Sequence, residues 1–120
     1  MTRNATGKSA VAQAVETCHE CLQWIIPLLD QFPRNRRFTL GERIEAGLLN
    51  VLELLLEAAY TREKSRSLAA ANRRLAVVRH LWRLCVELKV IPLNRYEHGT
   101  GLFLDLGRQI GGWHRSLASA

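Results

Sequence analysis

The sequence predicts an all-α protein that folds as a single domain over residues 1–120, an up-down-up-down antiparallel four-helix bundle. Good helix formers (Leu, Ala, Arg and Glu) are abundant, whereas aromatic residues make up only 7%. Apolar residues recur at helical spacing in four stretches, and no short window alternates as a strand would. Because 48% of the 120 residues are hydrophobic, the chain can bury a sizeable core, which excludes wholesale disorder.

The first predicted helix covers residues 11–31 and follows a tail of residues 1–9. Pro27 lies inside it, and because proline removes a backbone hydrogen bond, we expect it to bend the helix or end it early. Phe32-Pro33 closes the segment, since the residue before a proline avoids the helical region. The apolar residues of this helix are Val11, Val15, Cys18, Leu22, Trp24, Ile25, Ile26, Leu28 and Leu29.

The second predicted helix begins after a short basic loop, residues 34–37. Thr39 is a good N-cap, and Glu42 three residues later completes a capping box. The helix then extends to about Tyr60. Its apolar stripe comprises Leu40, Ile44, Leu48, Val51, Leu55 and Ala59, and its glutamates Glu42, Glu45, Glu53 and Glu57 lie on the opposite side.

Two further helices complete the predicted bundle. A charged connector, residues 61–67, leads to a third helix from Leu68 to about Val90, with Ser67 as its cap and Pro92 beyond its end. The fourth helix runs from residue 95 to about residue 117, and residues 116–120 form a tail. Glycines at positions 99, 101, 107, 111 and 112 predict a frayed or bent start to this helix.

Positive charge is concentrated in one part of the chain. The formal net charge is +6, from 17 basic and 11 acidic residues. Residues 62–83 hold seven bases against the single acid Glu63, so this segment alone accounts for the excess. The seven are Arg62, Lys64, Arg66, Arg73, Arg74, Arg79 and Arg83. Two interpretations remain open: a face that binds nucleic-acid phosphates, or a solvated face that pairs with Glu53 and Glu57.

A helical wheel divides the third helix into two sides. The basic side contains Asn72, Arg73, Arg79, His80, Arg83 and Glu87, and Arg66 joins it if the helix starts early. The apolar side contains Leu68, Ala71, Leu75, Val78, Leu81, Trp82, Cys85, Val86 and Leu88. Because this side is wider than a lone bundle usually buries, we expect an oligomer to cover part of it. Arg74 points into the apolar side, where it would pair with a carboxylate across an interface.

Other kinds of site find little support in the sequence. Cys18-His19-Glu20-Cys21 contains one C-x-x-C, but the spacing of the other Cys and His residues does not complete a four-ligand zinc site, which favours a core role. No catalytic motif or phosphate-cradling glycine loop occurs, so we expect no enzymatic activity, metal or cofactor. The tryptophans Trp24, Trp82 and Trp113 are interpreted as core or interface anchors, with base stacking left open for Trp113.

Targeting signals are also lacking in the sequence. Residues 1–10 have no apolar signal-peptide region, and the longest uncharged apolar stretch, residues 21–29, is too short to cross a membrane. Three cysteines, an odd number, do not form a disulfide framework. We therefore expect a reducing, cytoplasmic location and no membrane partner.

Motifs in several parts of the chain resemble the Avd family, the accessory variability determinants of diversity-generating retroelements. Phe32-Pro33-Arg34, followed by residues 37–44, resembles the family's junction between its first two helices. Ala59-Tyr60 with Arg62, and then residues 68–88, resemble its third helix, and Gly111-Gly112-Trp113 resembles its C-terminal signature. The similarity covers residues 20–115, and the junction and the final Gly-Gly-Trp are fairly specific in combination.

The resemblance implies a non-enzymatic helper of a reverse transcriptase. Members of the family are basic, assemble as a barrel-like homopentamer of four-helix bundles, and bind the reverse transcriptase and nucleic acid. They support copying of a template-repeat RNA with adenine-directed errors, and the cDNA then replaces a variable repeat in a target gene. Basic residues carry the family's binding role, and the matching positions here are Arg73, Arg74, Arg79 and Arg83, with Arg34, Arg36 and Arg37.

Two other hypotheses stay open at this point. The broader class includes bundles encoded in intervening sequences of large-subunit ribosomal RNA genes, so the chain could be a structural bundle of that type without a retroelement partner. The other hypothesis is a metal or redox bundle that uses Cys18 and Cys21. The basic excess favours the retroelement group.

Overall fold

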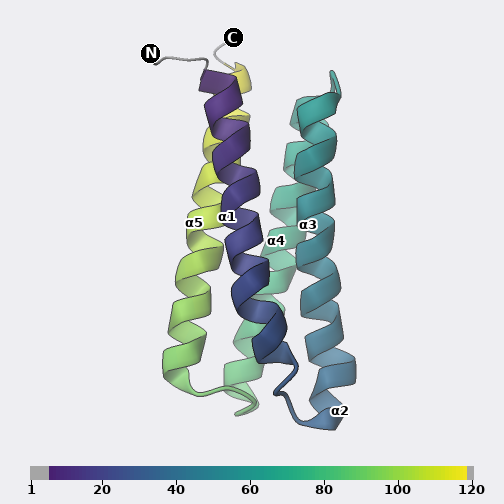
Figure 1. Ribbon diagram of the computed structural model, residues 1–120, viewed down its shortest axis with the longest axis vertical. Helices are drawn as coiled ribbons and strands as arrows, with labels where there is room; N and C mark the ends of the chain where they lie inside the picture. The colour runs from purple at the N-terminus through teal and green to yellow at the C-terminus, as the bar shows by residue number, and fades with distance from the viewer. Residues whose placement is uncertain (1–5, 119–120) are drawn as a thin grey trace.

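The computed structural model describes the backbone of residues 6–118 and the side chains of residues 10–118. Four long helices form the body of the protein: α1 (Thr6–Leu29), α3 (Glu42–Tyr60), α4 (Lys64–Glu87) and α5 (Leu93–Ala118). Before α3 come a single helical turn, α2 (Arg34–Arg36), and a π-helical turn, η1 (Arg37–Gly41). Successive long helices run in opposite directions, as Figure 1 shows, and residues 6–118 contain no strand. The prediction of an all-α, up-down-up-down bundle is therefore confirmed.

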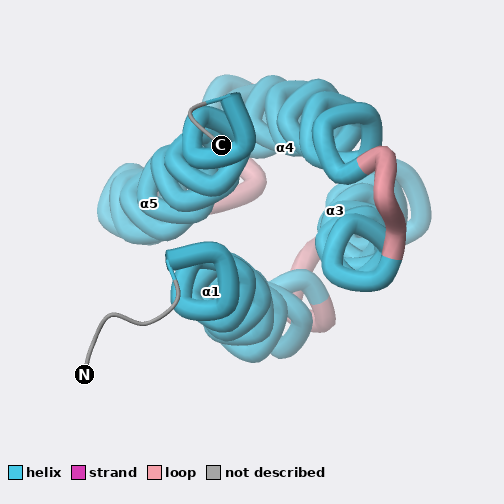
Figure 2. The backbone as a smooth tube through the Cα atoms, turned by 90° about the horizontal axis from the view of Figure 1, so that it is seen from above, coloured by secondary structure: helices cyan, strands magenta, loops and turns pink. Residues whose placement is uncertain are grey.

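The four long helices surround one core, and each lies beside two others (Figure 2). Helix α1 packs against α3 and α5, and α4 packs against the same two helices from the opposite corner. The molecule measures 46 × 25 × 19 Å. This arrangement gives α4 two flanks, one toward α3 and one toward α5, and leaves its outer face to solvent.

Large side chains at the centre of the bundle are fully buried. Trp82 and Phe103 meet edge to face, with ring centroids 5.8 Å apart, and the half-buried Trp24 packs against Trp82 in the same way at 6.0 Å. Trp113 is 1% exposed, so it is a core anchor and offers no ring face for base stacking. The other large side chains that are fully buried are Ile25, Leu29, Ile44, Leu48, Leu55, Leu68, Leu75, Leu106 and Ile110.

The entry into α3 differs from the prediction. Residues 34–37, expected as a loop, are helical, because the carbonyl of Pro33 accepts hydrogen bonds from the backbone N–H groups of Arg36 and Arg37, both at 2.8 Å. Proline is well suited to the start of a helix, since its φ angle is already helical. Thr39 lies inside η1 and donates its hydroxyl to the carbonyl of Asn35 at 2.9 Å. The predicted capping box at Thr39 is therefore wrong.

Helices α1 and α5 are longer than predicted. Helix α1 begins at Thr6 and α5 ends at Ala118, so residues 6–9 and 116–118 are helical rather than tail. The rest of the predicted tails, residues 1–5 and 119–120, lies outside the described residues. Pro27 lies within α1, which ends two residues later at Leu29 and so stops short of residue 31.

The start of α4 also differs from the prediction. The helix begins at Lys64, so Ser67 lies inside it and is not its cap. The ammonium of Lys64 donates to the carbonyls of Ala58 and Ala59, at 2.8 and 3.4 Å. A cation at these carbonyls stabilises the C-terminus of α3, where the helix dipole is negative.

Two glycines bring α4 close to its neighbours. A Cβ added at Gly99 would lie 2.6 Å from the Trp82 ring, and one at Gly47 would lie 2.6 Å from the Val78 side chain. Helix α5 is continuous over 26 residues from Leu93, so its glycines do not produce the predicted frayed start. At position 99 the missing side chain serves packing, because it admits the indole of Trp82. Of the helices described, none is long and apolar enough to cross a membrane.

Candidate nucleic-acid interface

Four arginines of α4 extend along its solvent side. Arg66, Arg73, Arg79 and Arg83 are all exposed, and the helical rise places the first and last about 25 Å apart. Their ion pairs are local: Arg66 with Glu63 at 3.4 Å and Arg83 with Glu87 at 2.9 Å. Within residues 10–118, none of them pairs with Glu53 or Glu57. Exposed pairs of this kind contribute little stability, so the guanidinium groups remain available to an anionic ligand.

The other candidate residues do not join this face. Arg34, Arg36 and Arg37 lie in and beside α2, at the end of the bundle opposite the α3–α4 connector that holds Arg62 (Figure 1). Arg37 is half-buried between Asp30 and Glu45, at 3.4 and 3.2 Å, and Arg34 lies over the Phe38 ring at 6.0 Å. Lys64 caps α3, and Arg74 faces the α3 flank. The predicted nucleic-acid-binding residues therefore do not form one surface. The four exposed arginines of α4 lie along one helix, and the other candidates lie elsewhere.

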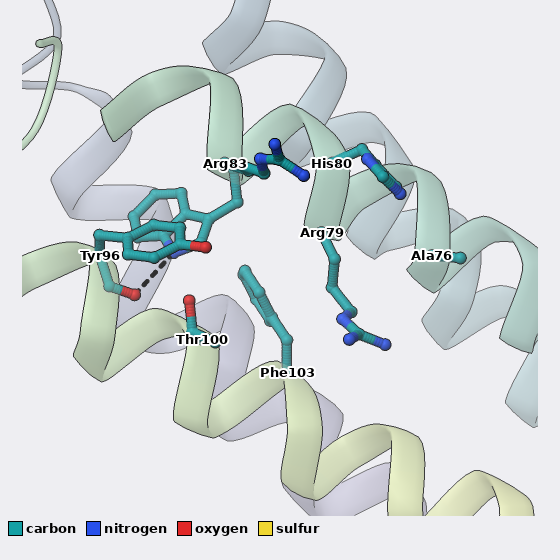
Figure 3. Close-up of a pocket in the computed structure, with 8 residues that line it drawn as sticks. Ala76, Arg79, His80, Arg83, Tyr96, Thr100 and Phe103 are labelled. Atoms are coloured by element: carbon teal, nitrogen blue, oxygen red, sulfur yellow. Dashed lines mark hydrogen bonds between the residues drawn. The ribbon is translucent and has the colours of Figure 1, made fainter. Parts of the chain in front are cut away.

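A groove lies between α4 and α5, with a volume of about 250 Å³ (Figure 3). Arg79, His80 and Arg83 line it from α4, and Tyr96 and Thr100 line it from α5. Trp82 and Phe103 form its floor. Sequence reasoning missed Tyr96 and Thr100. Their four-residue spacing matches that of Arg79 and Arg83, but only the pairing of the two helices places them opposite the arginines.

The α3 flank of α4 has a second groove of about 350 Å³. Arg43 from α3 and Arg74 from α4 line it together with apolar side chains, among them Val77 and Leu81. Arg74 makes no ion pair with any residue in the described part of the chain, so its pairing with a carboxylate across an interface stays a prediction. Sequence reasoning also missed Arg43.

An apolar seam continues from this groove along α4. It consists of Val77, Leu81, Leu84 and Leu88, whose spacing of four, three and four residues is that of a coiled-coil contact. Val77, Leu84 and Leu88 are 46, 40 and 52% exposed. The bundle therefore leaves part of the wide apolar side of α4 uncovered.

The cysteines are buried in the core as free thiols. Burial raises the pKa of Cys18, Cys21 and Cys85 to about 12, so each stays protonated at neutral pH. Residues 10–118 contain no group of three or more side chains able to hold a metal ion. Cys18 and Cys21 are fully buried in the core cluster, so the C-x-x-C of α1 packs in the core, as the sequence favoured.

Comparison with known proteins supports one assignment. No curated protein matches the chain. A family model described as bAvd-like matches residues 12–117, nearly the whole of the sequence. The match contains all the segments that resemble the Avd family: the helix 1–2 junction, Ala59-Tyr60 with Arg62, residues 68–88 and the final Gly-Gly-Trp. The chain belongs to the bAvd-like family.

Proposed function

We propose that this protein is a non-enzymatic accessory protein of a diversity-generating retroelement. In the cytoplasm it binds the reverse transcriptase and the template-repeat RNA, and so supports mutagenic cDNA synthesis and retrohoming. Family membership supports the accessory role. The observation that carries the nucleic-acid part is the exposure of Arg66, Arg73, Arg79 and Arg83 along one side of α4. A helper of this kind contributes by binding and positioning, so its effect appears in the reaction of the enzyme.

Phosphate contacts explain how such a face would hold RNA without reading its sequence. Guanidinium groups match phosphate oxygens with two parallel hydrogen bonds, and each contact displaces counterions from the nucleic acid. Affinity should then fall steeply with salt concentration. The face should also tolerate many template sequences, because phosphate contacts carry no sequence information.

A paired substitution tests the basic face. Arg66→Ala with Arg73→Ala should lower RNA affinity on all sequences alike, and flatten the log–log salt slope by roughly 0.7 to 0.9 for each phosphate that is no longer neutralised. The matched control is Arg95→Ala with Arg108→Ala, which removes the same charge from exposed positions on α5. If the two double variants behave alike in anisotropy titrations, the effect comes from net charge and the α4 face has no special role.

We also propose that the protein assembles as a homopentamer, as the family resemblance implies. The apolar seam of α4 is the surface that we assign to contacts between subunits, and Arg74 beside it would meet a carboxylate of the next subunit. Heterologous contacts of this kind close into a ring when the rotation between subunits permits. Light scattering should then give a mass near five times 13.6 kDa.

Exposed leucines allow a clean test of the seam. Leu84→Glu with Leu88→Glu should shift the mass toward that of one subunit, since charge would be buried at the contact. Leu104→Glu is the control, because Leu104 lies on α5, outside the seam, and is 40% exposed, as is Leu84. A wild-type protein that remains monomeric at micromolar concentration would exclude the pentamer.

The reverse transcriptase should bind another surface. Glu53 and Glu57 are exposed on α3, whereas Glu45 is held by Arg37, so of these three glutamates the first two offer free negative charge to a basic enzyme. Glu53→Lys with Glu57→Lys should weaken a direct complex in pull-downs treated with ribonuclease, and Glu16→Lys with Glu20→Lys on α1 is the control. The retroelement role fails if the reverse transcriptase does not associate with this protein, with or without RNA, and cDNA synthesis is unchanged when the protein is omitted. A structural bundle of the type encoded in intervening sequences of ribosomal RNA genes would then be favoured.

A further inference from the structure

The α4–α5 groove combines positive charge, hydroxyl groups and a rigid aromatic floor. Arg79 extends from α4 toward α5, and the hydroxyl of Thr100 points into the same space (Figure 3). No carboxylate lines the groove, and Arg79 makes no ion pair within residues 10–118. Arg83 at the rim donates its Nε to Glu87 at 2.9 Å, which leaves its two terminal nitrogens for another acceptor. An anion can therefore bind without first displacing an internal partner.

The floor of the groove is fixed before any ligand arrives. The Nε1 of Trp82 donates to the backbone carbonyl of Tyr96 at 3.0 Å, and the Tyr96 ring lies nearly parallel to the Trp82 ring, at 19°. Phe103 meets Trp82 edge to face, and Gly99 leaves the room that the indole occupies. Tyr96 itself is only half-buried and lines the groove. Preorganisation of this kind lowers the entropy cost of binding.

We propose that the α4–α5 groove is a subsite for one nucleotide of a single-stranded nucleic acid. Its phosphate binds Arg79 and the terminal nitrogens of Arg83, and its base and sugar lie against Tyr96 and Thr100. This inference rests on the proposed function, because it specifies which form of nucleic acid the basic face prefers. The volume of about 250 Å³ is below the range usual for drug-sized ligands, which fits one nucleotide rather than a longer segment.

Whether the nucleic acid is single- or double-stranded decides whether a nucleotide can enter the subsite. In a duplex the bases are paired inside the helix, so only phosphates can reach the arginines of α4. An unpaired base can turn toward the protein and stack on an aromatic side chain, an interaction that tolerates any base. The groove should therefore favour single strands, while Arg66 and Arg73 on the solvent side should serve both forms equally.

Arginine substitutions inside and outside the groove provide the test, with the full-length chain. Fluorescence anisotropy would measure binding of one labelled, unstructured RNA oligonucleotide and of its duplex with the complementary strand. Arg79→Ala should weaken single-strand binding by about tenfold, as expected when a charged hydrogen bond is removed, and duplex binding much less. Arg73→Ala, which removes the same charge outside the groove, should weaken both forms by the same, smaller factor. Equal effects of the two variants on both forms would overturn the subsite but leave the proposed function intact.

A substitution between uncharged residues tests the groove without changing the net charge of the protein. Thr100→Val keeps the shape of the side chain, and it should weaken single-strand binding by about threefold with no change for the duplex. No change for either form would argue against Thr100 as a contact. If the wild-type protein binds neither form at low salt, the proposed function itself fails.

A competition experiment separates a nucleotide in a strand from a free one. Adenosine 5′-monophosphate at millimolar concentration should displace the single strand from the wild-type protein only weakly, since it lacks the neighbouring phosphates that bind the rest of α4. Strong displacement that disappears in Arg79→Ala would assign the groove to a free mononucleotide and overturn its role in holding a strand.

Discussion

On the α3 flank of α4, Gly47 lets Val78 approach the backbone of the neighbouring helix, and on the α5 flank Gly99 does the same for Trp82. Each flank also ends in a shallow groove edged by arginine. The α3 groove is otherwise lined mainly by small and apolar side chains, whereas the α5 groove presents Tyr96 and Thr100 beside Arg79. The two flanks thus share a means of close packing but present grooves of different chemistry, one mainly apolar and the other lined by aromatic and hydroxyl groups.

The largest effect should come from filling the space at Gly99. Gly99→Ala places a methyl group within 2.6 Å of the fully buried Trp82 ring, which cannot move without disturbing Phe103 and Tyr96. We expect a loss of about 3 kcal/mol in the free energy of unfolding, typical of an overpacked core. Urea unfolding would measure it.

Gly101→Ala is the matched control for this change. Nothing lies within 4 Å of a Cβ at Gly101, which is an exposed position of the same helix. Alanine there should raise stability by about 0.5–1 kcal/mol, because it restricts the unfolded chain. Similar effects of the two substitutions would show that Gly99 serves helix flexibility and not packing.

The α3 flank should be less sensitive. Gly47→Ala meets the side chain of Val78, which is smaller than an indole, so we expect a loss of about 2 kcal/mol. Combining it with Val78→Ala should cost less than the sum of the two single changes, because the new methyl group fills the space that valine leaves. A strictly additive double mutant would contradict direct contact between these positions.

Alkaline pH tests the thiol of α4 that lies between the two flanks. Burial raises the pKa of Cys85 from 9.0 to about 12, so the folded state keeps the proton that the unfolded chain loses above pH 9. The stability that this burial contributes is complete below pH 9 and is lost as the pH rises toward 12. Between pH 8 and pH 10 the decline in unfolding free energy should be smaller in Cys85→Ala than in the wild type by about 1 kcal/mol. Equal declines would indicate that Cys85 is accessible in the folded protein.

The smallest effect concerns the end of α4. Lys89 has a φ angle of 61°, and the N–H of Val90 bonds to the carbonyl of Cys85 at 2.8 Å, the pattern of a Schellman motif, in which glycine is usual. Lys89→Gly should therefore raise stability by somewhat less than about 1 kcal/mol, since glycine relieves the left-handed strain but adds entropy to the unfolded chain. Differential scanning calorimetry would show a higher melting temperature, and a lower one would argue against strain at this position.

Most of the fold, including the order of the helices along the chain, could be predicted, because helix formation depends on local sequence patterns. Apolar periodicity located the four long helices, and the concentration of arginine in residues 62–83 located the basic face of α4. Predictions failed where two local signals competed. Thr39 and Glu42 form a good capping box, yet the helical segment already begins after Pro33, because the Pro33 carbonyl accepts two backbone hydrogen bonds. Glycine in α5 suggested a break, but a helix packed along its whole length tolerates glycine.

The sequence by itself determined the fold class, the charge of α4 and the family resemblance, since each depends only on the type and order of residues along the chain. Tertiary structure alone decided which basic residues remain free. Arg37 and Lys64 look like Arg73 and Arg79 in the sequence, yet Arg37 bonds to Asp30 and Glu45, and Lys64 caps α3. Tertiary structure also placed Tyr96 and Thr100 opposite Arg79, because the face that α5 turns toward α4 depends on how Gly99 admits Trp82. Contacts between helices depend on packing across the core, so they cannot be predicted from the local sequence pattern of one helix.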